Sequence, residues 1–179
     1  MEWNGIRGRS FGLSRRGVPG SGCQRVTSYH YVPPGKEVYP SSKALKAIEA
    51  TLTSAKASFQ RVKTWTTDGI YGETRGKIKK RKKSGCSCVD LEASALFSVA
   101  EFRGVEFGQV PLAADDAGGE SWDLRGCFGM GGEKEKALRM AVEACELIWF
   151  WLADNSKRSS HTLSGQAFCS WSNALVHGN

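Results

Sequence analysis

The spacing of apolar residues changes from one segment of this chain to the next. Four apolar residues between Ala44 and Leu52 recur at intervals of one, three and four positions, which is the period of a helix with one buried face. Ser41 or Ser42 can cap the beginning of such a helix, because a serine hydroxyl accepts a hydrogen bond from the first turn. The pattern therefore predicts a helix that runs to about Ala57.

The same reading predicts further strands and helices in alternation. Short apolar runs predict strands at 59–66, 86–89 and 105–114. Stretches with the helical period predict helices at 73–83, 92–102 and 133–152. Strands that alternate with helices form a sheet with helices packed on its faces. The chain is thus predicted to contain one α/β domain.

Both ends of the chain have a different composition. Residues 1–26 contain many glycines and Pro19, so we expect an irregular segment there. Residues 27–40 begin as a short aromatic strand that a Pro-Pro-Gly turn ends. Residues 153–179 are polar, rich in serine and without a clear period.

Polar residues collect where each predicted strand ends. They are Thr66, Thr67 and Asp68 after the first strand, Asp90 and Glu92 after the second, and Asp115 and Asp116 after the third. Carboxyl ends of parallel strands meet at one edge of a sheet, where open α/β sheets bind ligands, so we expect a site there. For each acid taken alone, capping of a helix N-terminus is an equally good explanation, and Glu92 and Asp115 stay open between the two roles.

The formal net charge of +7 is concentrated in two places, the start of the chain and the run 77–83. A basic segment can bind nucleic acid or a phosphate-bearing ligand. No aromatic residue is interleaved with the basic run, as single-stranded nucleic acid would require. A solvated helix face is therefore the preferred interpretation, and nucleic acid is not favoured as a partner.

The six cysteines are scattered and do not form a disulfide framework. Cys86 and Cys88 lack a second pair or histidines at metal-binding spacing, so the sequence indicates no metal site. Reduced, buried thiols are typical of a cytoplasmic protein. No apolar run is long enough to span a membrane, and the start has no apolar signal segment.

Four segments resemble nucleoside phosphorylases of the uridine and purine phosphorylase type, in the order of that family. They are Thr27–Tyr31 followed by Pro33 and Pro34, Thr64–Thr74, Val89–Phe97, and Asp115-Asp116 with Gly119–Trp122. The second and third segments are long, and the third reads Val-Asp-Leu-Glu-Ala-Ser-Ala-Leu-Phe. The resemblance extends over about residues 27–150.

The resemblance implies a three-layer α/β/α fold with a central mixed sheet. It also implies phosphorolysis, in which a nucleoside and inorganic phosphate give a free base and ribose 1-phosphate. Phosphate would then be a co-substrate, with no other cofactor. Such enzymes assemble as dimers grouped into hexamers, so a homo-oligomer is expected.

The same resemblance assigns the sugar side of the site. Glu92 corresponds to the acid that binds the ribose hydroxyls, and Leu91 stands where a methionine packs under the sugar. A carboxylate can accept hydrogen bonds from both hydroxyls while positive charge grows at the anomeric carbon. Thr67, at the end of the second segment's strand, is a further substrate-binding candidate.

The base side of the site follows from the same segments. Ile70 and Tyr71 fall where the family lines its base pocket. Asp115 corresponds to the acid that, in purine-specific members, protonates the departing base, and a protonated base leaves more easily. His30 is a pocket candidate from the first segment, with a structural hydrogen-bonding role as the alternative.

Departures from the family pattern set the alternatives. Gly72 replaces an arginine, which removes a cation near the base site, and Ala114 replaces a serine. The family also carries phosphate-binding strands, a glycine loop and arginines ahead of the first segment. We therefore expect a non-family start at 1–26, a partial phosphorylase domain at 27–152 that is truncated at its amino end, and a separate tail at 153–179. Two further hypotheses are a truncated nucleoside-binding homologue without catalysis and a hydrolytic nucleosidase, which needs water rather than bound phosphate.

Overall fold

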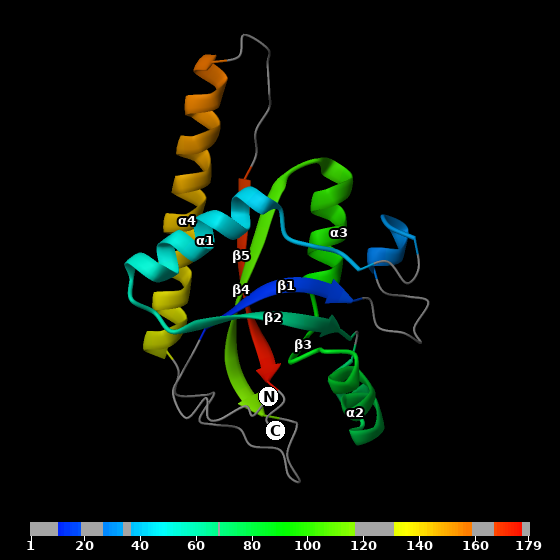
Figure 1. The fold of residues 1–179 in the computed structure, drawn as a ribbon. Coiled ribbons are helices and arrows are strands. Elements are labelled where there is room, and N and C mark those ends of the chain that lie inside the picture. Colours follow the sequence, from blue (N-terminus) through cyan, green and yellow to red (C-terminus); the bar gives the residue numbers. More distant parts are fainter. Residues whose placement is uncertain are drawn as a thin grey trace.

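Figure 1 shows the chain in a computed structural model that describes residues 11–18, 27–33, 37–67, 69–116, 131–158 and 167–176. The strands are β1 (Phe11–Val18), β2 (Phe59–Thr66), β3 (Cys88–Asp90), β4 (Glu106–Asp116) and β5 (Ala167–Val176). The α-helices are α1 (Ser42–Ser54), α2 (Arg75–Lys83), α3 (Ala93–Arg103) and α4 (Gly131–Arg158). Two short 3-10 helices, η1 (Thr27–His30) and η2 (Ile70–Gly72), lie in the connections.

The described strands form one mixed sheet that closes on itself in the order β1-β2-β3-β5-β4. Strands β1, β2 and β3 run parallel to one another. Strands β4 and β5 are parallel to each other and antiparallel to that group, because β5 pairs with β3 and β4 pairs with β1 in the antiparallel sense. The predicted mixed sheet is thus confirmed.

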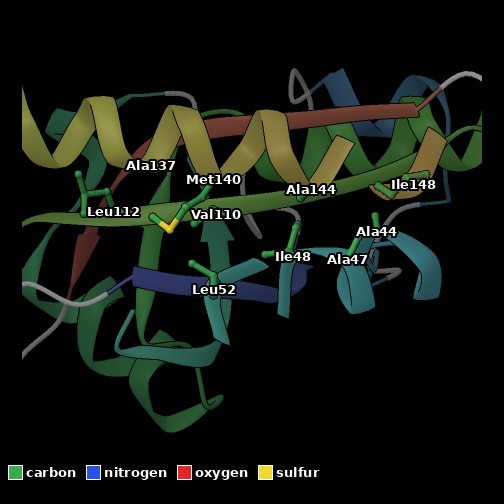
Figure 2. Close-up of a cluster of buried hydrophobic side chains, with 10 residues drawn as sticks. All are labelled: Ala44, Ala47, Ile48, Leu52, Val110, Leu112, Ala137, Met140, Ala144 and Ile148. Carbon is green, nitrogen blue, oxygen red and sulfur yellow. The ribbon is translucent and has the colours of Figure 1, made fainter. Parts of the chain in front are cut away.

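Helices α1 and α4 cover one face of this sheet, where they pack against β4 (Figure 1). Alternate residues of β4, Val110 and Leu112, point into the cluster that these two helices bury. Figure 2 shows this cluster, which consists of Ala44, Ala47, Ile48, Leu52, Val110, Leu112, Ala137, Met140, Ala144 and Ile148. The apolar face predicted between Ala44 and Leu52 is therefore the face that α1 buries.

Helix α3 packs on the opposite face with η1 (Figure 1). Phe107, the β4 residue of opposite orientation, contacts Phe97 of α3 edge to face, with 5.2 Å between the ring centroids. Val32 and Val38 complete this second cluster. Helices on both faces of a mixed sheet confirm the three-layer α/β/α fold.

The structure differs from the sequence-based expectation at both ends of the chain. β1 lies inside the segment 1–26 that was expected to be irregular, and it pairs in parallel with β2 from Phe11 to Val18. β5 lies inside the tail that showed no period, and it pairs with both β3 and β4. Backbone pairing with distant strands forms these two strands, and local composition does not report such pairing.

The aromatic strand expected at the start of 27–40 is also wrong. Residues Thr27–His30 form the 3-10 helix η1 instead, because the backbone N–H groups of Tyr31 and Val32 both donate to the carbonyl of Ser28, at 3.0 and 2.9 Å. Val38, further along, is fully buried.

Helix α2 has the solvated, basic character that its sequence predicts. Seven of its nine residues are Lys or Arg, and Ile78 is its one buried residue. The Arg81 guanidinium lies 5.5 Å from the ring centre of Trp65, which anchors the helix to β2. Among the helices that the structure describes, none has the length and apolar content to cross a membrane.

Candidate functional site

The ends of β2 and β3 are joined by side-chain and backbone hydrogen bonds. Thr66 and Asp90 face each other in the parallel register, and the Thr66 hydroxyl donates to Asp90 Oδ1 at 2.8 Å. The Thr66 hydroxyl oxygen accepts from the Ser94 N–H at 2.9 Å, and the Thr67 N–H donates to the Asp90 carbonyl at 2.9 Å. The polar residues predicted at these two strand ends therefore do meet.

Asp90 is a buried carboxyl that supports the beginning of α3. Its side chain is 4% exposed, and its Oδ1 also accepts from the Ala93 N–H at 3.2 Å. Burial raises the pKa of Asp90 to about 7, although the hydrogen bonds from Thr66 and from the backbone lower it in part. Its second oxygen, Oδ2, has no hydrogen-bond partner in the part of the chain that the structure describes. Asp90 thus caps the N-terminus of α3, which is the structural role that the sequence analysis considered for Glu92.

Glu92 is exposed and does not cap α3. It occupies the N-cap position with φ −126° and ψ −25°, yet its side chain makes no cap hydrogen bond. Because Asp90 already serves Ala93, the Glu92 carboxylate is available to a ligand at the edge of the sheet. Leu91, beside it, is 44% exposed and offers an apolar surface at the same edge.

The loop after β2 lies on the other side of this edge. Thr67 is buried, and its hydroxyl donates to the Gly69 carbonyl at 3.3 Å, which shapes the turn. Tyr71 in η2 is 96% exposed, so its ring is not covered by the residues that the structure describes. Ile70 begins η2, and its side chain, like the whole of Asp68, lies outside the described residues.

The ammonium of Lys77 also lies near this loop, and the sequence did not predict it there. The Lys77 ammonium lies 3.4 Å from the point where a Cβ on Gly72 would stand, and the Thr67 hydroxyl oxygen lies 3.9 Å from that point. The signal in the sequence was Gly72 itself, where the family motif has an arginine. The sequence pattern alone assigns Lys77 to the solvated basic run 77–83.

Asp115 was expected at the same edge of the sheet as Asp90, on the assumption that β2, β3 and β4 run parallel. Strand β4 runs antiparallel to β2 and β3, so its carboxyl end points in the opposite direction. Through β5, Asp115 stands in one row with Val89, because Leu175 pairs with both. Its side chain and the segment Gly119–Trp122 lie outside the described residues, whereas the next residue, Asp116, is buried.

His30 lies far from Glu92 within this chain. It ends η1, and the ring of the next residue, Tyr31, contacts Phe102 with 5.5 Å between centroids. Phe102 is in the last turn of α3, so roughly 15 Å of helix separates this contact from Glu92 at 1.5 Å per residue. The structure therefore brings together Thr67, Leu91 and Glu92, and leaves His30 apart.

The thiols near this edge are not reactive groups. Cys86 and Cys88 are free and buried, and burial raises the pKa of Cys88 to about 12. Within the described ranges, no group of three or more His, Cys, Asp or Glu residues could hold a metal ion.

Comparisons with known proteins show the family and the fold of this chain. A sequence model of the phosphorylase superfamily matches residues 8–148, so the match begins within the segment expected to be foreign. A search of curated proteins finds no match. Among solved structures, the chain is similar to the AMP nucleosidase from Bacteroides thetaiotaomicron VPI-5482, with a TM-score of 0.61 and 20% sequence identity. The similarity covers 78% of this chain and 55% of the nucleosidase chain, so this chain spans about half the length of that structure.

Proposed function

This chain belongs to the phosphorylase superfamily, and from that premise we propose that it binds a nucleoside and cleaves its N-glycosidic bond. One observation carries the proposal. The Glu92 carboxylate stands exposed at the junction of β3 and α3 and makes no cap hydrogen bond, because Asp90 caps the helix. An exposed carboxylate at the edge of a sheet that does not cap a helix is suited to bind a polyhydroxyl ligand.

Glu92 would hold the ribose. Its two oxygens can each accept a hydrogen bond from a ribose hydroxyl, and its negative charge stabilises the positive charge that develops at the anomeric carbon. Leu91, which is half exposed beside it, would cover the sugar and exclude water. Thr67 would contribute mainly through the turn that its hydroxyl maintains.

The base would leave from the side of η2 and β4. Tyr71 and Ile70 would line the base pocket, where an exposed tyrosine ring offers a stacking surface. Asp115 would protonate the base as the C–N bond breaks, so that the bonding electron pair leaves on a neutral base. This role rests on the family resemblance, and through β5 the backbone of Asp115 stands in one row with Val89.

The attacking group distinguishes two candidate reactions. In phosphorolysis, a phosphate oxygen forms the new bond to the anomeric carbon and ribose 1-phosphate results. The likeness to an AMP nucleosidase favours hydrolysis as the second candidate, in which water forms that bond. Phosphorolysis is our first choice because the motifs resemble phosphorylases.

A base-release assay tests this proposal. Purified protein is incubated with uridine, inosine, adenosine and AMP, with and without inorganic phosphate, and the free base is quantified. We expect release that depends on phosphate, and we expect Glu92→Ala to lower kcat/KM by about 100-fold through lost transition-state stabilisation. Phosphate-independent release would instead identify a nucleosidase.

The matched control is Glu101→Gln, which removes an exposed carboxylate from the other end of α3. It should retain activity within about twofold, since surface charges away from a site contribute little. If Glu92→Ala and the control release base equally, Glu92 is not the sugar ligand. If calorimetry shows nucleoside binding without any release of base, the chain is a binding protein and the catalytic part of the proposal is wrong.

A further inference from the structure

Helix α4 carries a second apolar stripe beside the one that enters the core. The buried stripe packs against α1 and β4. Next to it, Leu138, Val142 and Trp149 are 56%, 50% and 65% exposed, and Cys145 between them is half-buried. We call these four residues the outer stripe. Single exposed apolar residues are ordinary, but a continuous row of them along one helix marks a contact surface.

The outer stripe has the spacing of a coiled-coil seam. Its residues follow one another at intervals of four, three and four positions, which is the a/d repeat of two helices that pack side by side. From residue 138 to residue 149 the stripe is roughly 17 Å long at 1.5 Å per residue. Such a row fits between the side chains of a facing helix better than it fits a flat surface.

Charged residues border the outer stripe on the side away from the core. They are Glu135, Arg139 and Glu146, and all three are exposed. The Arg139 guanidinium donates from Nε and Nη2 to Glu135 Oε1, at 3.2 and 2.8 Å. A guanidinium has five N–H donors, so that of Arg139 can bind a second carboxylate at the same time.

A second copy of α4 in antiparallel orientation matches both the stripe and its border. If Val142 lies opposite Cys145 of the partner subunit, then Leu138 lies opposite Trp149 of the partner subunit. The same register brings Arg139 within reach of Glu146 of the partner subunit, and two-fold symmetry forms this ion pair twice. A parallel pair would instead place Arg139 against Lys134 of the partner subunit, which has the same charge.

The charges along the border favour a protein over a membrane as the occupant. Amphipathic helices that lie on membranes carry Lys and Arg beside their apolar face, which anionic lipids attract. Two of the three residues that border the outer stripe are glutamates, which anionic lipids repel.

We propose that the chain forms a dimer with a second copy of itself through α4, as an antiparallel helix pair with the outer stripe as its seam. Arg139 and Glu146 fix the register of this pair. The dimer does not depend on the proposed nucleoside chemistry. Helix α3, which Glu92 precedes, lies on the opposite face of the sheet from α4 (Figure 1).

Sedimentation velocity over a series of protein concentrations tests the dimer. We expect Trp149→Ser to raise the Kd of dimerisation by about tenfold and Val142→Glu to raise it by about 100-fold, since the latter places a charge in the seam. Phe102→Ser is the matched control, because Phe102 is 63% exposed but lies on α3, and its Kd should equal that of wild type. Circular dichroism should show a native fold in the α4 variants, because both altered side chains are exposed in the monomer.

Charge reversal tests the antiparallel register. Arg139→Glu and Glu146→Arg should each raise the Kd by about tenfold, and the double variant should recover most of the lost affinity. Within one chain these two residues are seven positions apart, which is roughly 10 Å along the helix, so an ion pair inside α4 cannot explain the recovery.

Wild-type protein that stays monomeric at every concentration would overturn the inference, as would a dimer whose Kd Val142→Glu leaves unchanged. A double charge reversal without any recovery would exclude the antiparallel register. Wild type that stays monomeric but co-sediments with vesicles of phosphatidylcholine and phosphatidylserine, with less binding in Trp149→Ser, would show that the outer stripe contacts a membrane and not a second copy.

Discussion

Two acids separated by one residue have opposite environments in this protein. Asp90 is buried, and its Oδ1 accepts hydrogen bonds from the Thr66 hydroxyl and from the Ala93 N–H in the first turn of α3. Glu92 is exposed, and its side chain makes no cap hydrogen bond. The pattern of residues could not assign these roles, because both positions suit a helix cap, and only the family resemblance assigned Glu92 to the ribose. The parallel register of Thr66 with Asp90 decides between them, and that register comes from pairing across the sheet.

The burial of Asp90 should make stability depend on pH. Its pKa is raised from an ordinary value of 3.8 to about 7, so the folded protein holds the proton more tightly than the unfolded chain does. The free energy of unfolding should therefore be highest below about pH 4 with respect to this group and fall as the pH rises toward 7. Asp90→Asn should remove that part of the decline, because asparagine cannot ionise and its carbonyl oxygen can still accept from Thr66.

Urea unfolding at a series of pH values between about 4 and 8 measures this effect. Glu146→Gln, at an exposed position of α4, is the control for losing one carboxylate. A decline of the same size in Asp90→Asn as in wild type would show that another group titrates.

The bounds of helices and strands could be predicted from the sequence where an element has a regular pattern of buried apolar residues. The expected strand at 59–66 coincides with β2, and the helices α1 and α3 begin within a residue or two of their predicted starts. β1 and β5 were missed because their glycines, serines and polar residues show no period, and only their partners in the sheet make them strands.

One close approach between elements predicts a specific defect. Gly108 of β4 lies under α1, and a Cβ there would stand 2.6 Å from Ile48 Cδ1 and 3.1 Å from Ala44 Cβ. Gly108→Ala should therefore cost about 1–3 kcal/mol of unfolding free energy through overpacking. Ile48→Val removes Cδ1, so the double variant should cost less than the two single variants together.

Chemical denaturation of the four proteins in this cycle gives the coupling energy. Gly76→Ala serves as the control, because nothing lies within 4 Å of a Cβ at that helical position. That control should be neutral or stabilising by up to about 1 kcal/mol. Strictly additive costs for Gly108→Ala and Ile48→Val would contradict the close packing of α1 on β4.

At the scale of the whole molecule, β5 joins two groups of strands that run in opposite directions. It pairs with β3 on one side and with β4 on the other, and Leu175 takes part in both pairings. The sequence could predict strands and helices in alternation, and the family resemblance implied a mixed sheet. The order and direction of β4 and β5 could not be predicted, because they depend on contacts between segments far apart in the chain.

A proline substitution tests the central position of β5. Leu175→Pro removes a backbone N–H between two paired strands, so it should destabilise the protein by more than about 1 kcal/mol or prevent folding. Ser42→Pro is the matched control, because the first position of a helix tolerates proline and Ser41 already has extended backbone angles, φ −66° and ψ 148°. Thermal unfolding followed by circular dichroism compares the two, and equal melting temperatures would exclude a central role for β5.

The place of β5 in the sheet has a consequence for biosynthesis. The strand is fifth in chain order, yet it stands between the third and the fourth in space. While the ribosome is still making this part of the chain, β3 and β4 each present an open edge with unsatisfied backbone groups. The sheet can close only after residue 176 has left the exit tunnel, so its final folding step follows synthesis of the other strands. Nascent chains that stop before β5 should therefore depend on chaperones that bind exposed strand edges.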